Sequence, residues 1–200
     1  MTQDVTGLLK GTSLYLVGMP GSGKTTFGQR LAEHLGYGFF DTDQMIETAV
    51  GQKTSQIFAE SGEKLFRDLE RQVLAELSPY GRCVIATGGG IVLKPENWSH
   101  LRNGVVLWLD VPLDLLLERL ESDDSRPLLV GDLKDRLTKL HGDRAPLYAQ
   151  ADLRLEVGEG DHNEVLVDRA VALLIEACEA KAQADAELLD LNRSVPFEAN

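Results

Sequence analysis

The sequence predicts an α/β protein, a doubly wound, three-layer sandwich in which a five-stranded parallel sheet lies between two layers of helices. Short apolar runs typical of buried strands alternate about five times with longer segments of helical periodicity. A glycine-rich loop joins the first strand to the first long helix, as in proteins that bind phosphate groups. The 200 residues suit one domain, and they contain no internal repeat and no linker.

The glycine-rich loop reads Gly18-Met-Pro-Gly-Ser-Gly-Lys-Thr25 and fits G-x-x-x-x-G-K-[ST], the P-loop pattern. Its glycines let successive backbone N–H groups point at a phosphate chain, at the positive end of the following helix. Lys24 adds a full charge near the β- and γ-phosphates, and Thr25 offers a hydroxyl oxygen to Mg²⁺. We therefore expect a nucleoside triphosphate to bind at Gly21, Ser22, Gly23, Lys24, Thr25 and Thr26.

The first half of the chain follows this plan closely. Residues 1–11 show no periodicity and are expected to form a flexible arm before a first strand at 13–17. Apolar residues four apart give the helix after the P-loop one buried face, and Gly36 ends that helix. A second strand at 38–40 delivers Asp41-Thr-Asp43 at its carboxyl end, where ligands bind in open α/β sheets.

The second half continues the alternation. We expect two short helices within 45–61 broken near Gly51, followed by a helix at 63–78, a strand at 83–86 and a glycine turn at 88–90. After this turn we expect a helix at 95–101, a strand at 105–109, a helix at 112–120 and a helix at 133–147 interrupted at Pro146. The last two expected elements are a strand at 153–157 and a helix at 165–178.

Two segments break the alternation. Residues 121–129 interrupt every periodicity and place Arg126 before a proline, so a mobile lid is expected at about 122–133. The kinase domain is expected to span 12–178. Residues 179–200 mix alanine with acidic residues and are predicted to be a disordered tail.

Composition limits the class of protein. A net charge of −12 argues against nucleic acid and anionic lipid as partners. No apolar run approaches the ~20 residues of a membrane span, and the N-terminus lacks the pattern of a secretory signal. Cys83 and Cys178 are best explained as buried free thiols, which implies a reducing cytoplasm. A few basic residues must then hold the polyphosphate against the overall negative field.

Among P-loop proteins, a small-molecule kinase fits best. The sequence has no Asn-Lys-x-Asp segment to read guanine, and it is too short for a helicase or a transporter ATPase. A kinase needs a carboxylate beside the acceptor hydroxyl, a second oxygen near Mg²⁺ and mobile cations over the γ-phosphate. The sequence offers residues for all three.

The chain resembles the shikimate kinase family over about residues 12–178. The motifs that carry this resemblance, in order, are Gly18 to Thr25, Asp41-Thr-Asp43, Phe66-Arg67 with Glu70, Gly88-Gly-Gly90, Arg126-Pro-Leu-Leu129 and Arg144-Ala-Pro-Leu-Tyr148. The resemblance implies transfer of the ATP γ-phosphoryl group to the 3-hydroxyl of shikimate, with Mg²⁺ as cofactor. We also expect a monomer.

The resemblance also implies roles on the acceptor side. Asp41 contacts Mg²⁺ through a water molecule, and Thr25 is the other residue of the metal site. Asp43 holds the shikimate hydroxyls and is the candidate base. Arg67, Arg144 and the backbone of Gly88, Gly89 and Gly90 hold the carboxylate and the ring hydroxyls. Planar guanidinium groups suit a carboxylate, which supports these assignments independently.

On the nucleotide side, the resemblance implies that Arg126 closes over the γ-phosphate and that Arg119 lies under adenine. Lys24, Asp43 and Arg126 are thus the expected catalytic residues. The acidic opening of the lid departs from the family pattern, and the turn near residues 158–163 cannot be matched to it. The tail after Glu179 has no counterpart in the family.

Several alternatives remain open at this level. Arg67 could pair with Glu70 on a solvated helix face, Arg144 could cap the end of its helix, and Asp43 could be the N-cap of the helix that follows it. Asp110 ends an apolar run in the manner of a Walker B strand, but the D-T-D pair already supplies carboxylates. The protein could also phosphorylate another hydroxy acid such as gluconate, or bind nucleotide without catalysis.

Overall fold

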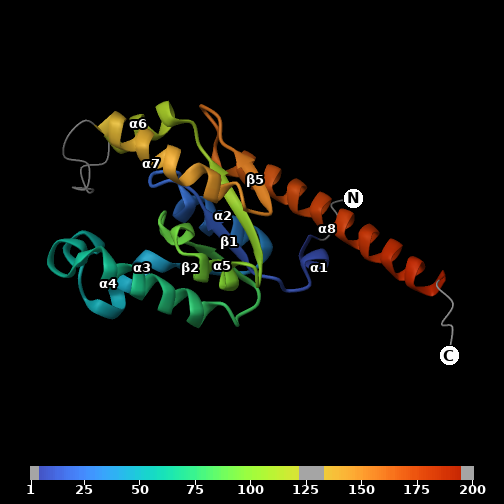
Figure 1. Ribbon diagram of the computed structural model, residues 1–200. Coiled ribbons are helices and arrows are strands. Elements are labelled where there is room, and N and C mark those ends of the chain that lie inside the picture. Colours follow the sequence, from blue (N-terminus) through green and yellow to red (C-terminus); the bar gives the residue numbers. More distant parts are fainter. Residues whose placement is uncertain (1–4, 122–132, 195–200) are drawn as a thin grey trace.

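Five parallel strands form the centre of the computed structural model, in the order β2-β3-β1-β4-β5 (Figure 1). The structure describes residues 5–121 and 133–194, without the side chains of 189–194. Helices cover both faces of the sheet, which confirms the predicted fold class. The strands are β1 Leu14–Val17, β2 Gly38–Asp41, β3 Cys83–Ala86, β4 Val105–Asp110 and β5 Leu153–Glu156.

The helices of the described residues alternate with these strands along the chain. They are α1 Val5–Leu9, α2 Lys24–Leu35, α3 Thr42–Val50, α4 Thr54–Leu77, the short 3₁₀ helix η1 Ile91–Leu93, α5 Pro95–Leu101, α6 Leu113–Glu121, α7 Leu133–Tyr148 and α8 Asn163–Ser194. Helix α2 packs against α8, whereas α4, α5 and α7 all contact η1.

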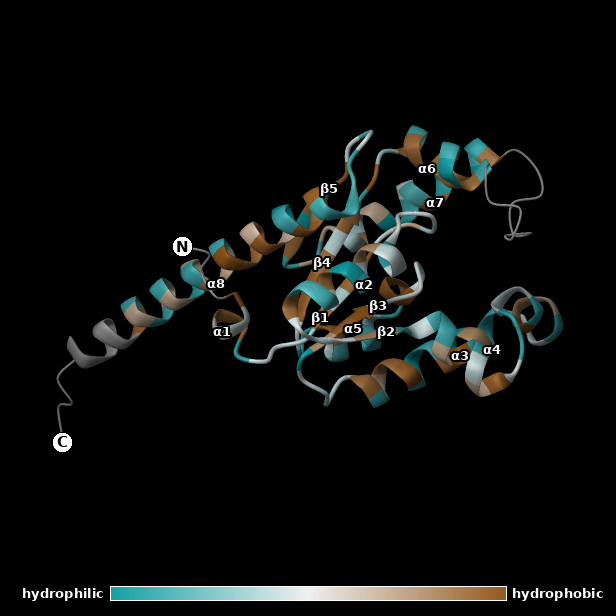
Figure 2. Ribbon diagram, turned by 180° about the vertical axis from the view of Figure 1, so that it is seen from behind, coloured by the Kyte–Doolittle hydropathy of each residue, from teal (hydrophilic) through white to brown (hydrophobic). Residues whose placement is uncertain are grey.

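Strand β1 occupies the middle of the sheet, and this position places the P-loop. Its residues pair with β3 on one side and with β4 on the other, and all four are fully buried. The three middle strands β3, β1 and β4 are coloured mainly hydrophobic in Figure 2, as expected of strands covered on both faces. The chain crosses from β3 past β1 to β4, so the carboxyl end of β1 lies at the crevice where open α/β sheets bind ligands.

The N-terminal segment is more ordered than the sequence predicted. Val5–Leu9 forms the one-turn helix α1, which packs on α8 and buries Val5 and Leu9. These two residues are four positions apart, so one helical turn puts both on the same face. A single turn is too short to show periodicity, and the prediction of a flexible arm is therefore wrong for these residues.

The C-terminal helix is longer than predicted. Helix α8 continues to Ser194, so the predicted disordered tail is wrong for residues 179–194. Alanine, glutamate, lysine, glutamine and leucine, which dominate this segment, all have high helix propensity, although the same composition is low in hydrophobicity. Residues 179–188 are exposed, and the helix projects from the rest of the molecule (Figure 1). No helix in the described ranges is both long enough and apolar enough to span a membrane.

The sequence predicted breaks in the helical regions near Gly51, between residues 61 and 63, and at Pro146. The first two are present in the structure, and the third is absent. Gly51 ends α3 with a φ of 73°, and Gly62 kinks α4 with a φ of 79° and a ψ of 168°. Pro146, in contrast, does not interrupt α7, because a backbone bond of 2.9 Å from the Ala149 N–H to the Ala145 carbonyl carries the helix past it. Proline removes one donor there without ending the helix.

Candidate functional site

The P-loop leads directly into the N-terminus of α2. Gly21 and Gly23 have φ values of 80° and 89°, which other residues rarely adopt. No side chain in the described part of the chain caps this helix end. Its first N–H groups and the positive end of the helix dipole therefore suit a bound anion.

Lys24 lies over the inside of this loop. Its ammonium group donates hydrogen bonds to the carbonyls of Gly18 (3.0 Å) and Met19 (2.9 Å) and to Ser22 Oγ (3.2 Å). The side chain is buried, so the loop backbone holds the charge where a phosphate chain would lie.

Thr25 and Asp41 meet beside the P-loop. Thr25 Oγ1 donates a hydrogen bond of 2.6 Å to Asp41 Oδ2. The other carboxylate oxygen of Asp41 accepts from the backbone N–H groups of Asp43 (3.0 Å) and Gln44 (3.2 Å), so Asp41 is the N-cap of α3. The N-cap of α3, a role that the sequence left open for Asp43, is therefore filled by Asp41.

A second group of side chains lies around the glycine turn that follows β3. Arg67 forms ion pairs with Glu70 and, at 3.0 Å, with Glu63. The pair with Glu70 does not lie on a solvated helix face, since the side chains of Arg67 and Glu70 are only 13% and 1% exposed. Helix α4 therefore directs the buried Arg67–Glu70 pair toward the glycine turn that follows β3.

The glycines of this turn make room for those side chains. A Cβ atom at Gly90 would collide with the Arg67 guanidinium, and one at Gly88 would collide with Glu70 and lie 2.8 Å from Asp43 Oδ1. Asp43, Arg67 and Glu70 therefore converge on one short piece of backbone. The turn is anchored by a hydrogen bond of 3.1 Å from the Gly88 N–H to the hydroxyl of Thr42.

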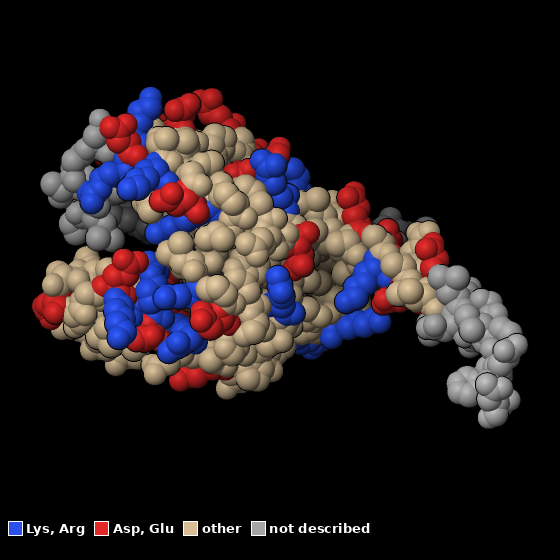
Figure 3. Space-filling model, in the orientation of Figure 1, with Lys and Arg blue, Asp and Glu red and all other residues tan. Residues whose placement is uncertain are grey.

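Helix α7 closes the other side of this group. Tyr148 is fully buried and donates a hydrogen bond of 2.6 Å to the carbonyl of Gly89, and Arg144 is close enough to this hydroxyl to oppose the rise of its pKa. Arg144 is close enough to Glu70 to lower the pKa of that carboxyl. Basic side chains thus come from both α4 and α7, and Figure 3 shows basic groups on both sides of the hollow between these parts of the molecule.

Burial raises the pKa of Glu70 from its ordinary 4.5 to about 7, and the pKa is further raised by Asp43 against the opposing effect of Arg67 and Arg144. Between pH 4.5 and 7, Glu70 carries a proton in the native state that it has released in the unfolded chain. The contribution of Glu70 to stability is therefore present below pH 4.5 and is lost as the pH rises through 7.

This shift predicts a difference between wild type and Glu70→Gln, which keeps the shape but does not titrate. The unfolding free energy of wild type relative to the variant should fall by at most about 1.4 kcal/mol per pH unit between pH 4.5 and 7. Urea denaturation of both proteins at pH 5, 6, 7 and 8 measures it. A difference that stays constant with pH would contradict the shift.

The P-loop also forms one wall of an open cavity of about 380 Å³. Arg119 of α6 lies at this cavity, with its Nη1 3.4 Å from the carbonyl of Ser22. The turn after β5 forms another wall and is held by Asp161, which accepts from the Gly158 N–H at 2.7 Å and pairs with Arg169. The lining residues are Gly21, Ser22, Gly23, Thr26, Phe27, Arg119, Asp161, His162, Asn163, Glu164 and Leu166.

Sequence reasoning missed two parts of the site. The turn at 161–164 could not be matched to a motif, although its place after β5, at the same edge of the sheet as the P-loop, was a usable signal. Tyr148 stood in a quoted motif without a role. Of the predicted site residues, Arg126 lies outside the described residues, as does the lid apart from Leu133.

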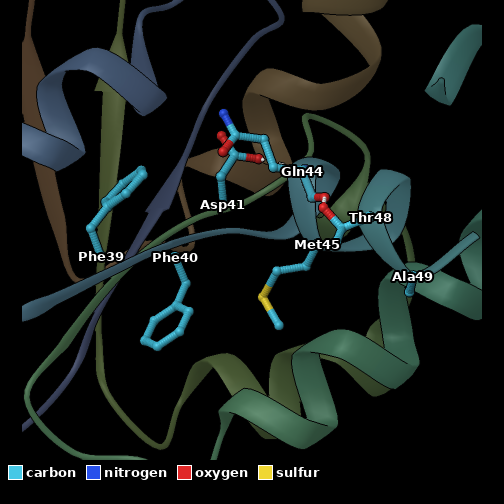
Figure 4. A pocket seen from close by; sticks show the side chains of 7 residues that line it. All are labelled: Phe39, Phe40, Asp41, Gln44, Met45, Thr48 and Ala49. Carbon is cyan, nitrogen blue, oxygen red and sulfur yellow. Dashed lines mark hydrogen bonds between the residues drawn. The ribbon is translucent and has the colours of Figure 1, made fainter. Parts of the chain in front are cut away.

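Two other features do not belong to the site. Asp110 is paired with Arg154, whose Nε lies 2.8 Å from Asp110 Oδ2. A hollow of about 390 Å³ lies along the edge strand β2 and α3, lined by Phe39, Phe40, Asp41, Gln44, Met45, Thr48 and Ala49. In Figure 4 Phe40 and Met45 point to one side and Asp41 to the other.

Comparison with known proteins agrees with this geometry. Residues 20–175 match the family model for shikimate kinase. The shikimate kinase of Microcystis aeruginosa is 52% identical over 167 residues, which are 83% of this chain and 88% of that one.

Solved structures show the same likeness. A shikimate kinase from Acinetobacter baumannii in complex with shikimate is 34% identical, has a TM-score of 0.73 and covers 96% of this chain and 99% of its own. A gluconokinase from Sinorhizobium meliloti has a TM-score of 0.55 at 18% identity, covering 87% of this chain and 97% of its own, and shares the fold alone. The chain therefore belongs to the shikimate kinase family.

Proposed function

We propose that this protein transfers the γ-phosphoryl group of ATP to the 3-hydroxyl of shikimate. The observation that carries the proposal is the convergence of Arg67, Arg144 and Asp43 on the glycine turn, which lies directly against the P-loop. Such a pocket offers guanidinium groups to a carboxylate and a carboxylate to hydroxyls. Shikimate is a small acid with several hydroxyls and needs both.

The nucleotide is expected to lie along the P-loop. The backbone of Gly21, Ser22 and Gly23 and the charge of Lys24 hold the phosphates, and Thr26 lies at the same cavity. The cavity extends from there to Arg119 and the turn after β5, which gives the adenine ring a place. Arg126 remains the predicted cation over the γ-phosphate.

Mg²⁺ fits the pair formed by Thr25 and Asp41. The Thr25 hydroxyl donates a hydrogen bond to the Asp41 carboxylate, so two hard oxygens of the kind that Mg²⁺ prefers lie side by side next to the P-loop. When bound, the ion neutralises charge on the phosphate oxygens. In the described part of the chain no three His, Cys, Asp or Glu side chains form a metal-binding group, which fits an ion that takes most of its ligands from phosphate and water.

The residues of the chain then supply positioning and charge. Arg67 and Arg144 hold the carboxylate, and the backbone of Gly88 to Gly90 forms the floor of the acceptor pocket. Asp43 orients the 3-hydroxyl toward the γ-phosphate, and we assign it as the group that accepts the hydroxyl proton. Lys24 and Arg126 stabilise the negative charge of the transferring group.

A coupled assay of ADP release tests the proposed function. ADP release is expected with shikimate and not with gluconate or nucleoside monophosphates, at equal protein concentration and with Mg²⁺ and ATP present. The product should carry its phosphate on the 3-hydroxyl. Faster turnover with gluconate, or release of ADP that does not depend on the acceptor, would contradict the proposal.

Lysine should not replace the two arginines of the acceptor pocket. Arg67→Lys and Arg144→Lys are each expected to raise the KM for shikimate about tenfold or more, because a point ammonium lacks the planar fork that bonds a carboxylate twice. Steady-state kinetics with each substrate varied in turn measure this effect. Arg71→Lys, on the exposed side of the same helix, is the matched control. An equal rise in the KM for ATP would indicate a structural role instead.

We also propose that the protein is a cytoplasmic monomer. The described acceptor pocket and P-loop come from one chain and need no second copy. Both cysteines are free thiols, with Cys83 buried and Cys178 half-buried, which suits a reducing compartment.

A further inference from the structure

We propose that Tyr148 is a positioning residue of the acceptor pocket, whose hydroxyl ties α7, the helix that carries Arg144, to the glycine turn. This inference rests on the proposed function, because it concerns how the pocket for the acceptor is held. Tyr148 donates to the Gly89 carbonyl at 2.6 Å, and Arg144 lies one helical turn before Tyr148 on α7, so this bond links the helix that carries Arg144 to a turn 59 residues away.

The link is built to be rigid. Tyr148 has no exposed surface, and its ring stacks on Trp108 of β4 with a centroid distance of 6.0 Å. The ring is therefore fixed by the sheet, and the hydroxyl has little freedom to leave the Gly89 carbonyl. Removing a buried donor would also leave the Gly89 carbonyl without that partner, which costs more than the loss of a solvated bond.

Gly89 extends the link to the nucleotide side. A Cβ atom on Gly89 would lie 3.0 Å from Pro20 Cδ and 3.3 Å from the Gly18 carbonyl oxygen, so this part of the turn is in contact with the P-loop. The hydroxyl of Tyr148 therefore fixes the position of the glycine turn between the P-loop and α7. It also sets the direction in which Arg144 approaches a bound carboxylate.

The protonation state supports this use of the hydroxyl. Burial raises the pKa of Tyr148 to about 12, a shift that Arg144 and Arg67 only partly oppose. The hydroxyl thus keeps its proton throughout the neutral range and remains a donor to Gly89. Tyr148 does not exchange protons with the substrate in this arrangement, and its effect passes through Arg144 and the turn.

The test is Tyr148→Phe, which fills the same space and removes only the hydroxyl. The KM for shikimate should rise about three- to tenfold, the loss expected for one buried hydrogen-bonded hydroxyl. The KM for ATP should stay the same and kcat should change less than about twofold. Steady-state kinetics with each substrate varied give these values, and thermal melting shows that the variant is folded.

Tyr15→Phe is the matched control. Tyr15 is also a fully buried tyrosine, but it lies in β1 and its hydroxyl has no hydrogen-bond partner among the described residues. Its removal should leave both KM values unchanged. If Tyr148→Phe behaves like Tyr15→Phe, or if it raises both KM values equally, the positioning role is overturned.

A double variant tests the path through Arg144. Lysine at position 144 already displaces the guanidinium fork, so adding Tyr148→Phe to Arg144→Lys should raise the KM for shikimate by less than it does in wild type. Effects that multiply as if independent would contradict coupling through Arg144. Wild-type turnover with shikimate tests the proposed function by itself, so an active wild type with an unchanged variant overturns only the role of Tyr148.

Discussion

Asp43→Asn should lower kcat with shikimate by about 10²–10³-fold while the KM for ATP stays nearly unchanged. The side chain of Asp43 lies beside the glycine turn and Glu70, on the acceptor side of the site, and its backbone is held by the Asp41 cap. Asparagine keeps the size and loses the charge and the proton acceptor. Steady-state kinetics with both substrates varied measure the effect.

Asp185→Asn is the control for this substitution, because it makes the same change at an exposed position of α8. It should leave kcat and both KM values unchanged. Near-normal turnover of Asp43→Asn with shikimate would show that Asp43 is not the group that orients the hydroxyl.

Lys24→Ala should lower kcat by about 10²–10³-fold and, unlike Asp43→Asn, also raise the KM for ATP. The ammonium group lies against the Gly18 and Met19 carbonyls within the P-loop, so its loss removes charge from the place where the β- and γ-phosphates bind. Initial rates at saturating shikimate over a range of ATP concentrations measure both effects.

The matching control is Lys181→Ala on the exposed part of α8, which should be kinetically silent. The melting temperature of Lys24→Ala should be recorded as well, since Lys24 also holds the loop backbone. A folded Lys24→Ala protein with normal kcat would contradict the placement of the phosphates on this loop.

Local patterns were enough to place the sheet and the P-loop. Strand β3 was predicted at its observed bounds, and the other strands were predicted within a residue or two, because each is a short apolar run next to glycine or a polar turn. The ends of α2 and α3 could be read from Gly36 and Gly51, since a left-handed residue after a helix is a local requirement.

Patterns that depend on partners distant in sequence were harder to interpret. Helix α1 is held by α8, more than 150 residues away, and nothing in its own five residues shows that contact. The alanine-rich end of α8 satisfies both the composition of a disordered tail and the propensity of a helix, and only the structure distinguishes them.

By itself, the sequence determined the fold class, the P-loop with Lys24 and Thr25, and the candidate residues Asp43, Arg67 and Arg144. The fold class and the P-loop follow from residue types at short spacings, whereas the other three candidates follow from the resemblance to the shikimate kinase family. Only the tertiary structure decided that Asp41 caps α3, that Glu70 is buried with a raised pKa, and that Tyr148 joins the glycine turn to α7. Burial and hydrogen bonding between distant segments exist only after the sheet has brought those segments together, so no local pattern can encode them.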